Sequence, residues 1–190
     1  AIKDIVPAVK IQIAFYEQYG IEGLKSFKET IKYAKKNGLM IIGDVKRGDI
    51  GNTAKAYALA YSSSDFEVDF ITVNPYLGSD SIFPFIEVCK NQNKGIFILV
   101  KTSNPSSSEI QDQITSNGRK IYEKVAEYVN EIGKNLKGEK KYSCIGAVVG
   151  ATYSKDAKVL RAIMPKTFFL VPGYGAQMAN VDDIMPCFNE

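Results

Sequence analysis

The chain has 190 residues, 45% of them hydrophobic, which is enough to bury one sizeable core, and nothing in its composition calls for two domains. Its formal net charge is only +3 and its lysines are spread along the chain, so neither a nucleic-acid nor a membrane partner is indicated. Histidine is absent, which excludes Ser-His-Asp and Cys-His catalysis and leaves Lys, Asp, Glu, Tyr or Cys for any proton transfer.

In the first half of the chain, short apolar runs alternate with longer amphipathic ones, a pattern typical of strands alternating with helices. The predicted elements are a strand over residues 6–13, a helix with Leu24, Phe27, Ile31 and Ala34 on one face that closes at Asn37 and Gly38, a strand over 40–46, a helix over 52–61 and a strand over 70–74.

The second half continues the alternation. A turn at residues 75–78 leads to a helix that Ser79 or Asp80 can cap, with its buried stripe at Ile82, Phe85, Ile86 and Cys89. The remaining predictions are a strand over 96–100, a long helix over 121–136, a strand over 144–149, a helix that Ser154 caps and that ends before Pro165, and a strand over 168–171.

Six strands alternating with five helices predict an α/β fold with a parallel sheet covered by helices. Both a doubly wound sheet and a TIM (β/α)8 barrel fit this count. Polar or special residues follow nearly every predicted strand, which favours the barrel, because its active site forms at the carboxyl ends of several strands.

The most charged of these strand ends lies at residues 44–53, directly after the apolar run 39–43. Side chains alternate along a strand, so Asp44 and Lys46 are expected on one face, with Asp49 in the loop that follows. A solvated ion pair would give the same spacing, and only the position after a buried strand favours a catalytic role.

The connection over residues 101–117 is polar, Ser-rich and longer than most loops in compact domains. It is either a tolerated surface insertion or a flap over the barrel mouth. Three cysteines, Cys89, Cys144 and Cys187, are widely separated, so we expect reduced, mostly buried thiols rather than disulfides or a zinc site. Without an apolar run of about 20 residues or a signal-like start, a cytoplasmic location is the default expectation.

Five motifs resemble the orotidine 5′-phosphate decarboxylase family. They are PAVKIQ at residues 7–12, DVKRGDIGNT at 44–53, VNPYLGSD at 73–80, VKTSNPSS at 100–107 and PGYGAQ at 172–177. Their order and their strand-end positions are similar to the branch of that family with a longer loop after the fifth strand, found in some bacteria and in malaria parasites.

The resemblance implies decarboxylation of orotidine 5′-monophosphate to uridine 5′-monophosphate and CO₂, in the last step of pyrimidine synthesis, without metal or organic cofactor. It implies that Lys46 protonates C6 of the pyrimidine and that Asp44 lies near the departing carboxylate. Lys10 is implied to bridge Asp44 and the ribose. Asp49 is implied to reach the ribose of the neighbouring subunit's ligand, so that each site requires a homodimer.

The same resemblance implies that Ser103 binds the pyrimidine edge and that Gln177 reaches the phosphate. Pro172 and Gly173 begin the turn suited to that phosphate; the alternative is that the glycine simply serves the turn. Three further candidates each have a plainer alternative: Ile50 and Val149 form the apolar wall of the carboxylate pocket or pack in a core, and Thr53 binds the phosphate side of the neighbouring site or caps its helix.

The barrel of that family has eight strands. Residues 1–190 are expected to form a single barrel domain with about six of them. The first strand, with a ribose-binding aspartate, and the last, with a phosphate-binding arginine, are missing from the pattern. Arg47, Arg119 and Arg161 do not occupy the matching context. We therefore expect a fragment that on its own folds poorly and has little activity, because an incomplete barrel exposes strand edges.

Two alternatives remain open from the sequence. One is a Mg²⁺-dependent sugar-phosphate lyase of the same superfamily, of the hexulose-phosphate synthase or keto-gulonate-phosphate decarboxylase type, which needs carboxylates free to bind the metal. The other is a non-catalytic nucleotide-binding dimer. The charged neighbours of Asp44 and Asp49 argue against the first, and the intact Lys and Asp set argues against the second.

Overall fold

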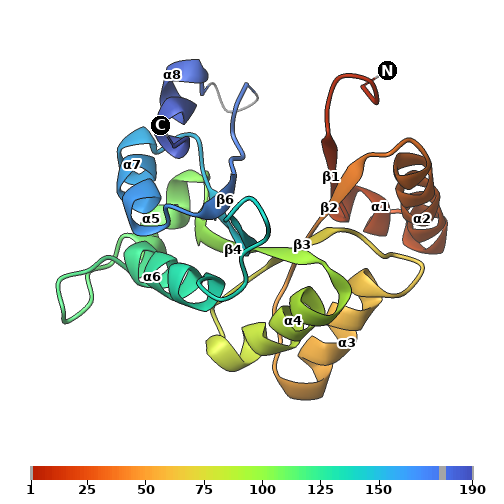
Figure 1. Ribbon diagram of the computed structural model, residues 1–190, viewed down its shortest axis with the longest axis horizontal. Coiled ribbons are helices and arrows are strands. Elements are labelled where there is room, and N and C mark those ends of the chain that lie inside the picture. The colour runs from red at the N-terminus through yellow and green to blue at the C-terminus, as the bar shows by residue number, and fades with distance from the viewer. Residues whose placement is uncertain (1, 176–178, 190) are drawn as a thin grey trace. The chain divides into compact units, whose positions relative to one another are not determined.

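The computed structural model describes residues 2–175 and 179–189, and the chain divides into two compact units, residues 1–96 and 97–190. Each unit alternates strands with helices (Figure 1). The predicted α/β class, with six strands in the described residues, is therefore confirmed.

In the first unit, three parallel strands pair in sequence order. The strands are β1 (Ala8–Gln12), β2 (Met40–Arg47) and β3 (Phe70–Val73), and the helices are α1 (Ala14–Glu17), α2 (Gly20–Lys36), α3 (Gly51–Ser62) and α4 (Ser79–Gln92). The parallel register sets Lys10 beside Ile42 and Gln12 beside Asp44. The carboxyl ends of β1 and β2 therefore lie together.

The core of the first unit forms from one face of each amphipathic helix and from the apolar strand residues. Phe27 on α2 is fully buried, and its ring makes edge contacts with Tyr16 and Phe66 at centroid distances of 5.2 and 5.6 Å. On α4 the side chains of Ile82 and Phe85 are fully buried, as the predicted stripe required. Burial of such aromatic rings is the main stabilising term for these helices.

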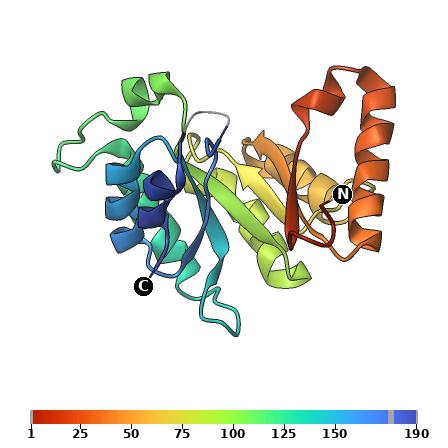
Figure 2. The same ribbon diagram turned by 90° about the horizontal axis from the view of Figure 1, so that it is seen from above.

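The second unit contains β4 (Gly95–Lys101), which begins at the unit boundary, followed by β5 (Ser143–Val149) and β6 (Thr167–Leu170). Its helices are η1 (Pro105–Ser107), α5 (Ser108–Gln111), α6 (Ile121–Gly133), α7 (Ser154–Ile163), α8 (Val181–Ile184) and η2 (Met185–Cys187). Figure 2 shows α7 among the helices that cover this unit, and α6 packs against both α7 and β5. Leu160 and Ile145 are fully buried in this core.

Two predicted helix caps are wrong. Gly78, with φ of +92°, precedes α4, so Ser79 and Asp80 lie inside the helix and do not cap it. Tyr153 precedes α7, and Ser154 is its first helical residue. The short helices α1, α5 and α8 were not predicted, because four residues are too few to show a helical period.

The long connection after β4 contains η1 and α5. Side-chain contacts attach it to the end of β4. The Lys101 side chain is 0% exposed, and its Nζ lies 2.9 Å from Asp112 Oδ2. Burial by itself raises the pKa of Asp112, but the hydrogen bonds and charges of Lys101 and Lys120 together outweigh burial and hold that pKa below its usual value. Gln111 also accepts from the Thr102 N–H at 2.9 Å. The C-terminal end of α5 is thus fixed to the end of β4.

The cysteines lie where small apolar residues would fit. Cys89 and Cys187 are buried and Cys144 is half-buried, in agreement with the expectation of mostly buried thiols. Within residues 2–175 and 179–189, no helix has the length and apolar character needed to cross a membrane. The prediction of one domain over residues 1–190 stays a prediction.

Candidate active site

The Asp44 carboxylate lies at the centre of the candidate site, at the carboxyl end of β2. Lys46 Nζ lies 2.6 Å from its Oδ1, and Lys10 Nζ from β1 lies 2.8 Å from its Oδ2. Two neutral donors complete the set: Thr72 donates to Oδ1 at 3.1 Å and Gln12 donates to Oδ2 at 3.0 Å. Each carboxylate oxygen therefore accepts one ammonium and one neutral hydrogen bond.

Burial differs sharply between the members of this cluster. The Asp44 side chain is only 8% exposed, whereas that of Lys46 is 45% exposed. A buried carboxylate is stable when its oxygens are fully hydrogen-bonded, and here the cluster provides that. The more exposed ammonium remains accessible to a bound molecule.

The prediction that Asp44 and Lys46 lie together is confirmed, but regular strand alternation is not the full reason. The β2–β3 register shifts between Gly43 and Arg47, and Lys46 has φ of +45°, in the left-handed region that non-glycine residues rarely adopt. A bulge of this kind re-aims side chains at the end of a strand. The local backbone, rather than a regular strand, directs Lys46 onto Asp44.

Opposing effects set the pKa of Asp44. Burial is the largest single effect and by itself raises this pKa. The hydrogen bonds and charges of Lys10 and Lys46 lower it, and together they outweigh burial. The net result is a pKa below the usual aspartate value. Asp44 is therefore ionised throughout the physiological pH range.

This lowered pKa predicts how acid affects stability. A carboxyl group with a lowered folded-state pKa stabilises the fold above its unfolded value of about 3.9, and this contribution is lost as the pH falls through the folded-state pKa. In full-length protein that carries these residues, urea unfolding from pH 7 to 3 should show a steeper loss of stability below about pH 4 than the Asp44→Asn variant shows. Equal slopes for both proteins would contradict the prediction.

The other candidates of the first unit lie at the start of α3. The Asp49 carboxylate is half-buried and its Oδ1 accepts from the Ile50 N–H at 2.8 Å, and no lysine or arginine of the described residues forms an ion pair with it. Ile50 is 54% exposed, so packing in the core of this unit is not its role. Ile50 also precedes α3 as its N-cap, so Thr53, which is exposed, does not cap the helix.

The three arginines that sequence context excluded as phosphate ligands all have partners. Arg47 donates to Glu17 Oε1 at 2.8 Å and to the Tyr61 hydroxyl at 2.9 Å. Arg119 pairs with Glu127 at 3.4 Å. Arg161 donates to the backbone oxygens of Met164, Thr167 and Cys187. These contacts tie helices and loops together.

The second unit carries the remaining candidates. Ser103 is half-buried just beyond β4, and Val149 is fully buried at the end of β5. Pro172 and Gly173 are half-buried, and Gly173 has φ of +107°, a conformation that only glycine adopts easily. Gln177 lies outside the described residues.

Sequence reasoning missed two members of the Asp44 cluster, Gln12 and Thr72. Gln12 follows Lys10 by two residues on the same strand and pairs with Asp44 in the register, so strand alternation could have found it. Thr72 had no comparable signal, because threonine is common in strands for reasons of propensity alone.

The cluster can support proton transfer and charge repulsion. An ammonium held beside a carboxylate can donate a proton to a bound molecule, and Asp44 can repel a second negative charge placed near it. Metal binding by Asp44 would require displacing lysine from its oxygens. Among the residues that the structure describes, no group of three or more Asp, Glu, Cys or His side chains could hold a metal ion.

Over most of its length the chain is similar to proteins of one known family. The family model described as "Orotidine 5'-phosphate decarboxylase / HUMPS family" matches residues 1–186. A relative from Clostridium novyi named orotidine 5′-phosphate decarboxylase is 49% identical over 177 residues, which are 93% of this chain and 62% of that protein. A second, from Clostridium perfringens, is 45% identical and the match covers 97% of this chain and 64% of that protein.

Solved structures give the same picture of the fold. The Plasmodium berghei orotidine 5′-monophosphate decarboxylase matches with a TM-score of 0.81 and 27% identity, over 95% of this chain and 56% of that one. The (β/α) barrel type of fold is thereby confirmed. The chain spans less than two thirds of the length of the relatives that it matches.

Proposed function

Because the chain belongs to the orotidine 5′-phosphate decarboxylase / HUMPS family, we propose that its protein decarboxylates orotidine 5′-monophosphate to uridine 5′-monophosphate and CO₂. The observation that carries this proposal is the Asp44 carboxylate held between the ammonium groups of Lys10 and Lys46. The relatives' names agree with it. The reaction is a step of pyrimidine nucleotide synthesis, uses no metal or organic cofactor, and takes place in the cytoplasm.

In the proposed reaction, the bond from C6 to the carboxylate breaks and its electron pair remains on C6 as CO₂ leaves. Lys46 Nζ gives a proton to C6 and regains one from solvent. Before that transfer, its positive charge stabilises the carbanion that develops at C6. Asp44, ionised and buried, repels the substrate carboxylate and so favours its departure.

Further residues are assigned to the pyrimidine and the phosphate in this proposal. Ser103 binds the pyrimidine edge, Val149 belongs to the apolar wall beside the carboxylate, and Pro172 and Gly173 begin the phosphate turn. Ile50 is a further wall residue in this proposal, and its exposure supports a role outside the core. Gln177 binds the phosphate.

The backbone around Ser103 predicts the effect of enlarging Gly150. A Cβ added to Gly150 would lie 2.7 Å from Ser103 Cα, too close for any real contact, so Gly150→Ala must displace Ser103. We expect the KM for orotidine 5′-monophosphate to rise on the order of tenfold. Gly138→Ala is the matched control, because its added Cβ would meet only the Tyr142 oxygen, at 4.0 Å. A folded Gly150→Ala protein with unchanged KM would argue against the Ser103 assignment.

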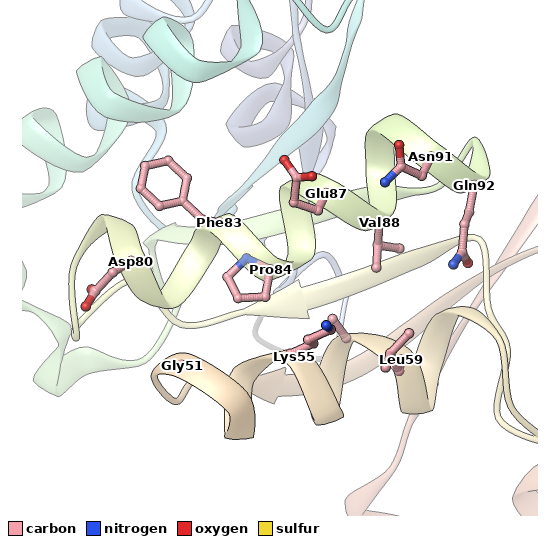
Figure 3. A pocket seen from close by; sticks show the side chains of 11 residues that line it. Gly51, Lys55, Leu59, Asp80, Phe83, Pro84, Glu87, Val88, Asn91 and Gln92 are labelled. Atoms are coloured by element: carbon pink, nitrogen blue, oxygen red, sulfur yellow. The ribbon is translucent and has the colours of Figure 1, made fainter.

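The protein acts as a homodimer in which Asp49 and Thr53 reach the neighbouring site. A groove of about 500 Å³ lies between α3 and α4 and begins at Gly51, two residues after Asp49 (Figure 3). Its position beside Asp49 supports the proposal that this face forms the dimer interface. Exposed apolar side chains, Leu59 and Phe83, lie along it. A symmetric dimer places the same patch of each copy in contact, and apolar patches of this kind mark such interfaces.

The rival activity is a Mg²⁺-dependent lyase of the hexulose-phosphate synthase or keto-gulonate-phosphate decarboxylase type, the alternative that the sequence left open. The test uses the full-length protein, orotidine 5′-monophosphate and excess chelator, with loss of orotate absorbance as the readout. We expect turnover to survive the chelator, which would also rule out a non-catalytic nucleotide-binding dimer. Turnover that requires added Mg²⁺, or no turnover of a folded and uridine monophosphate-binding protein, would overturn the proposal.

A further inference from the structure

We infer that Thr72 is a positioning residue that holds both the bulge carrying Lys46 and the carboxylate of Asp44. The inference deepens the proposed function and rests on it for its kinetic consequence, although the geometry stands independently. Thr72 lies on β3, a different strand from the two residues that it positions. Thr72 is 0% exposed, so all hydrogen bonds of its hydroxyl are made within the protein.

The Thr72 hydroxyl has three partners, all at the end of β2. Its oxygen accepts from the Val45 N–H at 2.9 Å and from the Lys46 N–H at 2.8 Å. A hydroxyl has one proton and two acceptor lone pairs, and these two N–H groups occupy both lone pairs. The single proton is therefore directed at its third partner, Asp44 Oδ1, 3.1 Å away.

These hydrogen bonds replace the backbone hydrogen bonds between β2 and β3 that are lost at the bulge. The β2–β3 register shifts between Gly43 and Arg47, so the N–H groups of Val45 and Lys46 lie within the disturbed part of the ladder. Buried N–H groups without acceptors are strongly unfavourable. By accepting from both, Thr72 stabilises the left-handed backbone of Lys46, whose φ is +45°.

The contact with Asp44 has a further consequence during catalysis. Lys46 and Thr72 both donate to Oδ1 of Asp44. When Lys46 gives its proton away, Oδ1 loses its charged partner, and Thr72 remains there to hold the carboxylate in place. Lys10 and Gln12 hold the other oxygen in the same interval. Asp44 therefore keeps its orientation while the lysine is neutral.

The test compares Thr72→Val, which is nearly isosteric and lacks the hydroxyl, with Thr72→Ser, which keeps it. Both are made in the full-length protein. We expect Thr72→Val to lower kcat by on the order of 10²-fold with little change in KM, because misplacing a reacting group by about 1 Å has effects of this size. Thr72→Ser should restore kcat to within a few-fold of wild type.

A second readout does not depend on activity. Amide hydrogen exchange at Val45 and Lys46 should be slow in the wild type and in Thr72→Ser, and fast in Thr72→Val. If Thr72→Val does not fold, Thr72→Ala is measured in the same way. Fast exchange at both amides in the wild type, or a folded hydroxyl-free variant with wild-type kcat, would overturn the inference. A wild-type protein with slow exchange but no turnover would overturn the proposed function and leave the positioning geometry standing.

Discussion

Replacing Lys46 with alanine should lower kcat for orotidine 5′-monophosphate by on the order of 10⁴-fold or more, because the change removes the proton donor and the charge facing the developing carbanion together. The fold should survive, since Asp44 keeps three donors, Lys10, Gln12 and Thr72. Binding of uridine 5′-monophosphate should therefore stay measurable by calorimetry. Unchanged turnover in Lys46→Ala would refute the proton-donor assignment.

A second substitution separates the two contributions of Lys46. Lys46→Arg keeps a positive charge near Asp44, but a guanidinium does not lose its proton at neutral pH and is a poor acid. We expect Lys46→Arg to be nearly as inactive as Lys46→Ala. Lys36→Ala is the matched control, since Lys36 is an exposed lysine at the end of α2, and it should leave kcat unchanged. High activity in Lys46→Arg would mean that charge, rather than proton donation, is the contribution that matters.

Two inactive variants should restore activity when they are mixed. If Asp49 acts on the neighbouring site, a hybrid dimer of one Lys46→Ala subunit and one Asp49→Ala subunit contains one site with both substitutions and one with neither. Random association makes about half of the dimers hybrids, so about a quarter of the wild-type activity should return. The half-buried Asp49 carboxylate, without a lysine or arginine partner among the described residues, is available for this contact.

The mixing experiment carries its own control. Mixing Lys46→Ala with Asp44→Asn should restore nothing, because both residues are expected to serve the same site from the same subunit, as their 2.6 Å contact requires. The subunits are mixed in mild denaturant and refolded, and turnover is measured against each variant alone. If the Asp49 mixture also stays inactive, although hybrid dimers are present, Asp49 does not act across a dimer.

Hydrophobic periodicity predicted the order of the strands and of the longer helices. The positions of charged residues after predicted strands indicated the cluster around Asp44. The pairing of Lys10 with Asp44 needed only parallel neighbouring strands, and the register places Gln12 beside Asp44. Helix starts were predicted poorly at Ser79 and Ser154, because capping depends on backbone angles just before the helix rather than on residue type alone.

By itself, the sequence determined which residues could do chemistry and where along the chain the strands end. Without histidine, it left Lys, Asp, Glu, Tyr or Cys for proton transfer, and its apolar runs put an aspartate and a lysine at the end of β2. Only the tertiary structure decided how Lys46 meets Asp44: through a bulge with φ of +45° held by Thr72 from another strand. The physical reason is that a bulge is stabilised by a buried hydroxyl 26 residues away in sequence, a contact that no local pattern encodes.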